Sequence, residues 1–296
     1  MRRVTGLLLA VLAVCILQIG AAQASASKVG ALKIATWNLD WLTAKPAGDP
    51  VLPRDVRPKS AHDIALLHGY ANILNADVVA FEEVDGPGVA ARVFSPRRYV
   101  LHLTRDHVVQ RVGLAIRRGI AFTANPDVTA LDTDPHARYP LRSGADVTLH
   151  LPGGALRILA VHLKTGCWQP GTHSHYRHAC RTLAKQDRIL ARWIRARRRE
   201  GVPFVVLGDF NRRIDRADPF LRKLERAAPL VSATAGQESP CWGGERFIDQ
   251  ILLGGAARQW VEPDSLRVLV YRQTGHIWKR RLSDHCPVSV RLHLPG

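Results

Sequence analysis

Nine short apolar runs, rich in valine, isoleucine and leucine, limit this chain's fold more than any other feature of its sequence. Each run is bounded by glycine, proline or aspartate, a pattern typical of buried β-strands. The runs are Leu32–Thr36, Val78–Phe81, Val112–Ile116, Val147–Leu149, Leu156–His162, Phe204–Leu207, Phe247–Leu253, Leu266–Val270 and Val288–Leu292. So many strands must bury their faces against one another or against helices, so the sequence predicts a sheet-based domain.

Two segments read as amphipathic helices. Ser60–Leu74 spaces its apolar residues at helical intervals, and its Ser60 and Asp63 resemble a capping box. The second helix is expected from about Thr182 to Arg199, where the apolar residues form one face. Many strands with few helices predict an α+β domain, in which each sheet is covered by helices on one side and by a second sheet on the other.

Residues 1–24 have the organisation of a cleavable signal peptide. Arg2 and Arg3 form a basic start, Leu7–Ile19 is apolar, and Ala22-Gln23-Ala24 offers a small-residue cleavage site, with Ala26 an alternative end. A membrane anchor is the other reading, but the run falls short of the roughly 20 apolar residues that a span requires. We therefore expect a secreted or periplasmic protein, without stable membrane insertion after cleavage, whose residues 25–296 form a single domain without an internal linker.

The charge balance favours a polyanionic partner. The chain carries 42 basic against 25 acidic residues, a formal net charge of +17. Such an excess favours nucleic acid or anionic lipid surfaces, although a basic surface also serves solubility.

The cysteines fit an exported protein. Loss of Cys15 with the leader leaves four, and an even number in an oxidising compartment predicts disulfides. Cys167 and Cys180 flank the loop-like segment GCWQPGTHSHYRHAC, so we predict that these two pair. Cys241 and Cys286 are then paired only by elimination.

Six separate segments each place a carboxylate, amide or imidazole beside a hydrophobic strand. The residues are Asn38, Glu82 and Glu83, His162, Asp209 and Asn211, Asp249, and Asp284 and His285. One aspartate or asparagine at a strand end is often only a cap or a turn residue. Six such placements with complementary chemistry predict a site of oxygen ligands and two imidazoles. Oxygen donors suit Mg²⁺, with Ca²⁺ or Mn²⁺ also compatible. Zinc is disfavoured, except at a loop containing His173, His175 and His178, which reads more readily as a polar insertion.

The motifs around these residues resemble those of the endonuclease/exonuclease/phosphatase family. TWNLDWL, DVVAFEEV, VHLKTG, LGDFN, FIDQILL and SDHCPV occur in the family's order, from about residue 31 to 292. The resemblance implies a four-layer α/β/β/α sandwich, with two mostly antiparallel sheets packed face to face and helices outside. It also implies a metal-dependent phosphoric ester hydrolase.

The resemblance also implies a role for each motif residue. Asn38, Glu83 and Asp284 would hold the metal, with Glu82 as second choice to Glu83. His162 and His285 match the two catalytic histidines. Asp209 and Asn211 would orient the attacking water and hold the phosphate, and Asp249 would fix the tautomer of His285. Arg142 matches a phosphate-binding arginine, and the sequence does not separate it from Arg138.

One departure concerns His162. Where deoxyribonuclease-like relatives carry a glutamate that supports the first histidine, this chain has Gln110. An amide cannot stabilise an imidazolium as a carboxylate does, so His162 is expected to act by hydrogen bonding rather than as a full base.

The substrate is inferred from export and charge. Both favour a nuclease acting on DNA or RNA as a monomer, because phosphate contacts with basic side chains supply much of the affinity. Candidate contacts are Arg97, Arg98, Arg105, Arg111, Lys164, Arg212 and Arg213. A sphingomyelinase-like or inositol-phosphatase-like hydrolase is the alternative, although SPCWGGERFIDQ lacks the inositol phosphatase signature. A non-catalytic binding module is disfavoured because every main motif position is filled.

Overall fold

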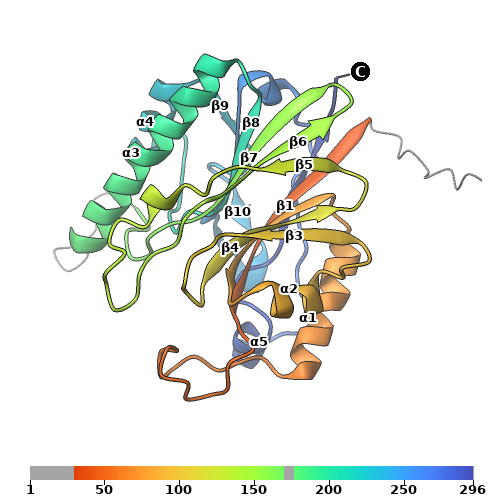
Figure 1. The fold of residues 1–296 in the computed structure, drawn as a ribbon, viewed down its shortest axis with the longest axis vertical. Coiled ribbons are helices and arrows are strands. Elements are labelled where there is room, and N and C mark those ends of the chain that lie inside the picture. The colour runs from red at the N-terminus through yellow and green to blue at the C-terminus, as the bar shows by residue number, and fades with distance from the viewer. Residues whose placement is uncertain (1–29, 170–176, 296) are drawn as a thin grey trace, which may run out of the picture.

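Two six-stranded sheets pack face to face in the computed structural model, which describes residues 30–169 and 177–295 (Figure 1). The first sheet has the order β13-β14-β1-β2-β4-β3. Its strands are β1 (Ala31–Leu42), β2 (Val78–Val84), β3 (Tyr99–Leu103), β4 (Arg111–Arg117), β13 (Arg267–Val268) and β14 (Val288–His293).

The second sheet has the order β5-β6-β7-β8-β12-β9. Its strands are β5 (Ala121–Ala124), β6 (Ala145–Leu151), β7 (Gly154–His162), β8 (Phe204–Asp209), β9 (Leu230–Ser232) and β12 (Asp249–Gly254). The short strands β10 (Glu238–Ser239) and β11 (Glu245–Arg246) form a separate ribbon. Each large sheet has one parallel pair, β1 with β2 and β7 with β8, and its other pairs are antiparallel.

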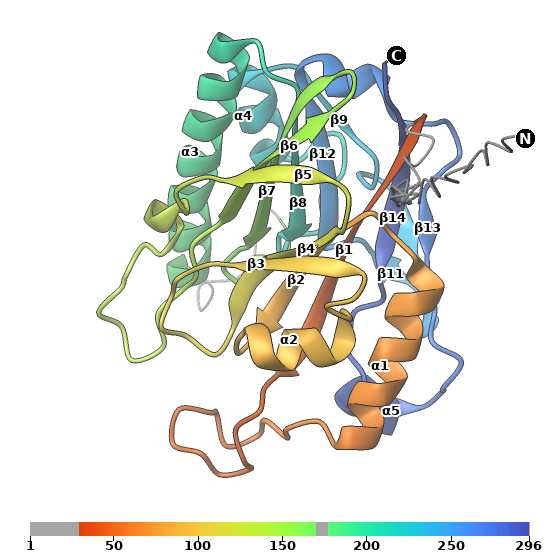
Figure 2. The same ribbon diagram turned by 45° about the vertical axis from the view of Figure 1, so that its right-hand side comes forward.

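Helices cover the outer faces of both sheets (Figure 2). They are α1 (Ala61–Leu74), α2 (Pro87–Val93), α3 (Arg177–Glu200), α4 (Pro219–Ala227) and α5 (His276–Arg281). Short 3₁₀ turns lie at Thr129–Leu131, Cys241–Gly243 and Gly255–Gln259. α1 and α2 pack on the first sheet, and α3 and α4 on the second. The predicted four-layer sandwich is confirmed.

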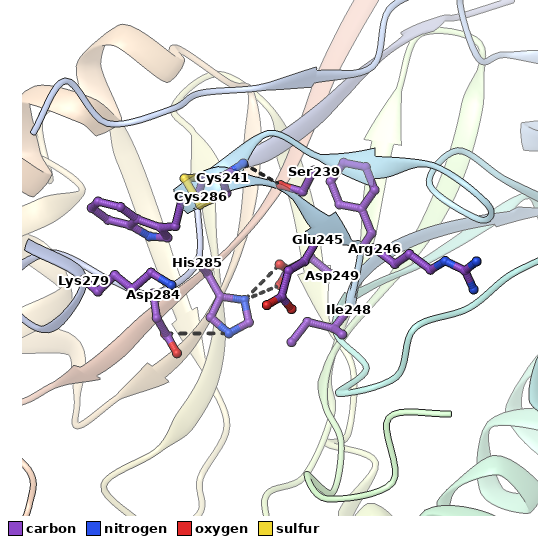
Figure 3. Close-up of a pocket in the computed structure, with 12 residues that line it drawn as sticks. Ser239, Cys241, Glu245, Arg246, Ile248, Asp249, Lys279, Asp284, His285 and Cys286 are labelled. Atoms are coloured by element: carbon purple, nitrogen blue, oxygen red, sulfur yellow. Dashed lines mark hydrogen bonds and ion pairs between the residues drawn. A yellow bond between two sulfur atoms is a disulfide. The ribbon is translucent and has the colours of Figure 1, made fainter. Parts of the chain in front are cut away.

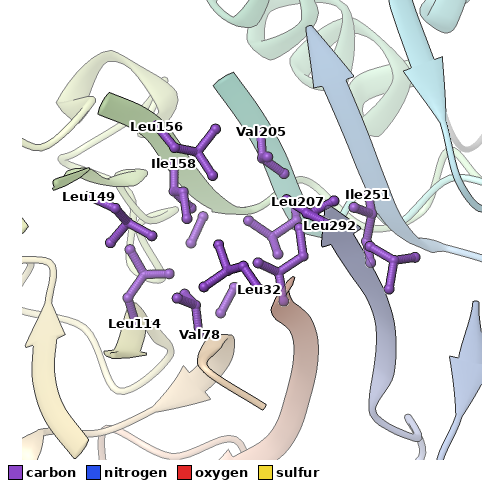
Figure 4. Packing of buried hydrophobic residues seen from close by; sticks show 14 of the residues in the cluster. Leu32, Val78, Leu114, Leu149, Leu156, Ile158, Val205, Leu207, Ile251 and Leu292 are labelled. Carbon is purple, nitrogen blue, oxygen red and sulfur yellow. The ribbon is translucent and has the colours of Figure 1, made fainter. Parts of the chain in front are cut away.

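Alternation along the strands explains why their sequences are almost continuously apolar. In β8, Val205 and Leu207 point between the sheets, whereas Phe204 and Val206 point towards α3 and α4. Figure 4 shows the layer between the sheets, where side chains from both interdigitate. Strands buried on both faces have no polar face, so the period-two signal disappears from the sequence.

The expected helices are present with small shifts in their ends. Ser60 caps α1, and the capping box is confirmed: the Asp63 amide donates to Ser60 Oγ (3.1 Å) and the Ser60 amide donates to Asp63 Oδ2 (3.1 Å). The second helix starts at Arg177, earlier than expected. β12 begins at Asp249 rather than Phe247, and β13 is only Arg267–Val268.

Both disulfides join the cysteines as expected, Cys167 with Cys180 and Cys241 with Cys286. No helix in the described part of the chain is long and apolar enough to cross a membrane. The expected signal peptide and His173 and His175 of the polar loop lie outside the described residues.

Gly208 lies inside β8 and not in a turn. Its φ is +141°, and a Cβ there would lie 1.9 Å from the carbonyl oxygen of Val161 on the neighbouring strand β7. Only glycine lets β7 and β8 approach at this point, one residue before Asp209.

Gly208→Ala should therefore lower the free energy of unfolding by about 3 kcal/mol or more, because a clash with backbone adds to the strain of a positive φ. Gly201→Ala is the matched control: its φ is +68°, but nothing lies within 4 Å of the new methyl group, so it should cost only about 1 kcal/mol. Urea unfolding of both variants measures the difference. Equal losses would mean that φ alone sets the cost.

Candidate active site

The ends of three strands in the second sheet bring His162, Asp209 and Asp249 together. His162 and Asp209 are the last residues of the parallel strands β7 and β8 and lie in register, while Asp249 begins β12 opposite Asp209. His162 Nε2 lies 3.5 Å from Asp209 Oδ2. Strand register therefore assembles this half of the site.

Asn38 connects the first sheet to this cluster. Its Nδ2 lies 3.1 Å from Asp209 Oδ2 and 3.1 Å from Glu83 Oε1, so β1, β2 and β8 meet at one point. Glu83 has a φ of +60°, and the pairing of β2 with its neighbours shifts register there. This irregularity lets Glu83 face the cluster, 3.5 Å from His162 Nε2, although its neighbour Glu82 points inward.

Asn211 forms the turn after β8. Its φ is +51°, and its backbone amide donates to Asp209 Oδ1 at 2.7 Å. Its side-chain Nδ2 lies 3.1 Å from both Asp209 Oδ2 and the carbonyl oxygen of Leu163. An asparagine tolerates this left-handed conformation better than most residues, and the hydrogen bonds fix the Asp209 carboxylate in one orientation.

His285 and Asp249 form a buried pair (Figure 3). His285 Nδ1 lies 2.9 Å from Asp249 Oδ2, while its Nε2 faces Asp209 Oδ2 at 3.7 Å and Asp284 Oδ1 at 3.8 Å. Burial alone would lower the pKa of His285, but the surrounding carboxylates, above all Asp249, raise it well above the ordinary value. The carboxylates around His285 thus favour its imidazolium form. The disulfide from Cys286 to Cys241 ties the next residue to the loop behind it.

His162 has the opposite electrostatics. The Arg142 guanidinium lies against its ring, with Nε 3.0 Å and Nη2 2.8 Å from Nδ1 and Nη2 2.6 Å from Nε2. Burial, Arg142 and His285 together lower the pKa of His162 well below its usual range. The contact with Arg142 is a cause of this lowered pKa that the sequence did not indicate.

Asp209 shares its environment with these charges. Burial raises the pKa of Asp209 to about 7, opposed by His285 and reinforced by Asp249. A carboxyl group with this pKa exchanges a proton with water near neutral pH, as general-base chemistry requires.

Sequence reasoning missed Asp40 and Lys59. Burial raises the pKa of Asp40 to about 7; Lys59 opposes this shift, and Asp284 and Glu83 add to it. The Lys59 ammonium is inaccessible to solvent, donates to the Asp40 carbonyl oxygen at 2.6 Å and lies 3.7 Å from its carboxylate. Only its position two residues after Asn38 could have indicated that Asp40 lies in the site. The sequence around Lys59 contains no pattern that would have indicated the same for Lys59.

A cleft of about 470 Å³ exposes the cluster. Its lining includes Asp40, Glu83, Arg142, Lys164, Asp209, Asn211, Asp284 and the two histidines His162 and His285. Asn38 is buried behind this surface and contacts it through its amide, and Asp249 lies behind His285. Arg138 lines a neighbouring pocket instead, with its guanidinium 5.4 Å from the Tyr139 ring.

The oxygen donors in the cleft fit a hard divalent cation. Among the described residues, no three histidine, cysteine or acidic side chains form a ready metal cage. Mg²⁺ needs none, since it is usually held by one or two carboxylates, with waters and substrate oxygens completing its shell. Glu83 and Asp284 supply two carboxylates, and both raise the pKa of Asp40, which marks an excess of negative charge at this place.

Glu82 does not compete for that role. It is fully buried, accepts a hydrogen bond from Thr36 Oγ1 at 3.1 Å, and does not line the cleft.

Two of the expected substrate contacts have other partners. Arg212 is buried and donates to Asp218 Oδ1 at 2.9 Å and to the Cys167 carbonyl oxygen at 3.0 Å. It therefore stabilises the structure beneath the cleft and does not lie at the rim. Arg213 pairs with Glu245 on the surface at 2.7 Å. The sequence shows two adjacent arginines and does not reveal this difference.

Arg212→Ala should lower the free energy of unfolding by about 3 kcal/mol, because it leaves the buried Asp218 carboxylate without its partner. Arg213→Ala is the matched control and should change it by less than about 1 kcal/mol, as an exposed ion pair does. Thermal or urea unfolding compares the two. Similar losses would show that the Arg212–Asp218 pair does not stabilise the fold.

The comparisons with known proteins agree with this architecture. The chain resembles TDP2 from Caenorhabditis elegans at 14% identity and a TM-score of 0.61, covering 89% of this chain and 98% of that one. It resembles D. rerio TDP2 complexed with single strand DNA product at 17% identity and a TM-score of 0.58, covering 88% of this chain and 98% of that one. It resembles the 3'-5' exonuclease NExo from Neisseria meningitidis at 16% identity and a TM-score of 0.53, covering 88% of this chain and 99% of that one.

The sequence comparison with curated proteins gave no match. The sequence profile of the endonuclease/exonuclease/phosphatase family matches residues 35–285, a range that contains the candidate site residues from Asn38 to His285. The chain belongs to the endonuclease/exonuclease/phosphatase family.

Proposed function

We propose that this chain is an exported, divalent-metal-dependent phosphodiesterase that hydrolyses DNA or RNA. The observation that carries the proposal is the convergence of Asp209, His162 and the His285–Asp249 pair on one cleft. A carboxylate beside an imidazolium and a guanidinium suits attack by water on an anionic phosphorus centre.

The proposed chemistry assigns the water to Asp209. With a pKa near 7, its carboxylate accepts the proton of the attacking water, and the amide of Asn211 holds it in position. As the P–O bond to the leaving oxygen breaks, that oxygen takes up a proton from solvent water, and negative charge on the equatorial oxygens is stabilised by the His285 imidazolium and by Arg142. Asp249 accepts from His285 Nδ1 and keeps Nε2–H directed into the cleft. Neutral His162 donates a hydrogen bond to the phosphate.

The metal would be held by Asn38, Glu83 and Asp284, with Asp40 beside them. Mg²⁺ fits these oxygen donors best, and Mn²⁺ or Ca²⁺ would also fit. When bound, the ion supplies Lewis-acid stabilisation of the phosphate charge.

Nucleic acid as substrate is supported by the net charge of +17 and by the neighbours TDP2 and NExo, of which one is complexed with a single strand DNA product and the other is an exonuclease. Two disulfides support export into an oxidising compartment. We propose that the exported chain is monomeric.

To test this, the purified protein is incubated with plasmid DNA, RNA, sphingomyelin or inositol phosphates, each in the presence of Mg²⁺ and in the presence of a chelator. We expect metal-dependent cleavage of nucleic acid. Turnover of the lipid or of inositol phosphates with intact nucleic acid would overturn the proposal.

A further inference from the structure

A second pocket of about 230 Å³ adjoins the candidate active site. It shares Trp41, Gln110, Tyr139 and Pro140 with the catalytic cleft, so a substrate in one continues into the other. We call the part formed by Trp41, Val108, Arg138, Tyr139 and Pro140 the aromatic subsite.

The aromatic subsite combines flat apolar surfaces with a positive charge. Tyr139 is 53% exposed, and the Arg138 guanidinium lies 5.4 Å from its ring centre. The described residues lining the pocket include no carboxylate. Aromatic rings and guanidinium planes are the surfaces on which unpaired nucleobases stack.

Trp41 ties this subsite to the proposed metal site. Its backbone is left-handed, with a φ of +57°, and the preceding Asp40 has a φ of +45°. The Trp41 amide donates to Glu83 Oε2 at 3.1 Å. Two consecutive left-handed residues are costly outside glycine, and such conformations persist where the surrounding structure holds them, as at binding sites. Here they place the indole at the junction between the cleft and the pocket.

We propose that the aromatic subsite binds an unpaired nucleobase next to the scissile phosphate, and that the enzyme therefore prefers single-stranded nucleic acid. The proposal rests on the proposed nuclease function. A duplex keeps its bases stacked on one another, so it cannot place a base in the aromatic subsite without unpairing it. A flexible single strand can, and gains stacking energy in doing so.

The test compares kcat/KM for a single-stranded oligonucleotide and for the same sequence as a duplex, using the full chain with Mg²⁺. Tyr139→Ala should lower kcat/KM on the single strand by about tenfold, the equivalent of about 1.4 kcal/mol of stacking, and leave the duplex value unchanged. Tyr139→Phe, which keeps a ring, should retain the wild-type preference. Ile73→Ala removes a 58% exposed side chain of α1 outside the aromatic subsite and should change neither value.

Equal losses on both substrates, or no loss on either, would overturn the aromatic subsite while leaving the nuclease intact. Loss of binding to phosphatidylcholine–phosphatidylserine vesicles in Tyr139→Ala, with unchanged nucleic-acid cleavage, would reassign the surface to lipid. A wild-type protein that cleaves neither form of nucleic acid would instead overturn the proposed function itself.

Discussion

Replacing His285 by alanine should lower kcat/KM for phosphodiester cleavage by about 10³-fold, within the range that a positioned acid–base group contributes. Among the described residues, His285 is the side chain that forms ion-pair contacts with both Asp249 and Asp209, at 2.9 and 3.7 Å. Its loss removes the positive charge that balances Asp209 and that would stabilise the charge growing on the phosphate. Steady-state cleavage of a labelled oligonucleotide at saturating Mg²⁺ measures the effect.

Asp249→Asn tests the same pair from the other side. The amide keeps the size of the side chain but removes the charge that contributes most to raising the pKa of His285. The imidazole then spends more time neutral or in the wrong tautomer, so we expect a loss of about 10²-fold or more, mainly in kcat.

His276→Ala is the matched control, an exposed histidine at the start of α5 in the same segment of the chain. It should retain full activity, and thermal unfolding of all three variants separates catalysis from folding. A His285→Ala protein that keeps its fold and full activity would refute the assignment of the site.

The sequence predicts those parts of the fold that are buried on both sides. Long apolar runs such as Leu156–His162 and Phe204–Leu207 became β7 and β8 nearly as expected, because a central strand has no other stable environment. The helices α2, α4 and α5 were missed. They have 7, 9 and 6 residues, too few to be stable alone, so tertiary packing decides them. Edge strands such as β5, largely exposed, have no apolar run to identify them.

The residues brought together at the candidate site were also accessible from sequence, because strand ends carry distinctive side chains. Their electrostatics were not. The neutral state of His162 depends on Arg142, which lies 20 positions away in sequence. The left-handed backbone at Asp40, Trp41 and Glu83 changes which side chains face the cleft. No local sequence pattern predicts this backbone conformation. Arg212 and Arg213 differ only through partners that the fold supplies.

The dependence of cleavage on a divalent metal is the second large effect that we expect. A chelator should reduce cleavage to background, and Glu83→Gln should raise the Mg²⁺ concentration for half-maximal activity by about 100-fold, because an amide replaces a charged ligand of a hard cation. Glu83 lines the cleft and contacts Asn38 at 3.1 Å, so the loss falls on the cation site itself. Titration of activity with Mg²⁺ and calorimetry of Mn²⁺ binding measure it independently of each other.

Glu82→Gln is the control that makes this result specific, since it removes a carboxyl group of the same size from the adjacent residue. Glu82 is fully buried and accepts from Thr36. Burial, Asp249 and Asp209 raise the pKa of Glu82 well above its ordinary value, which favours the neutral carboxyl form, and glutamine resembles that form in size and charge. We expect an unchanged Mg²⁺ requirement. If instead Glu82→Gln raised that requirement and Glu83→Gln did not, the cation would belong to Glu82, and the inward-facing carboxyl would have to turn towards the cleft to bind it.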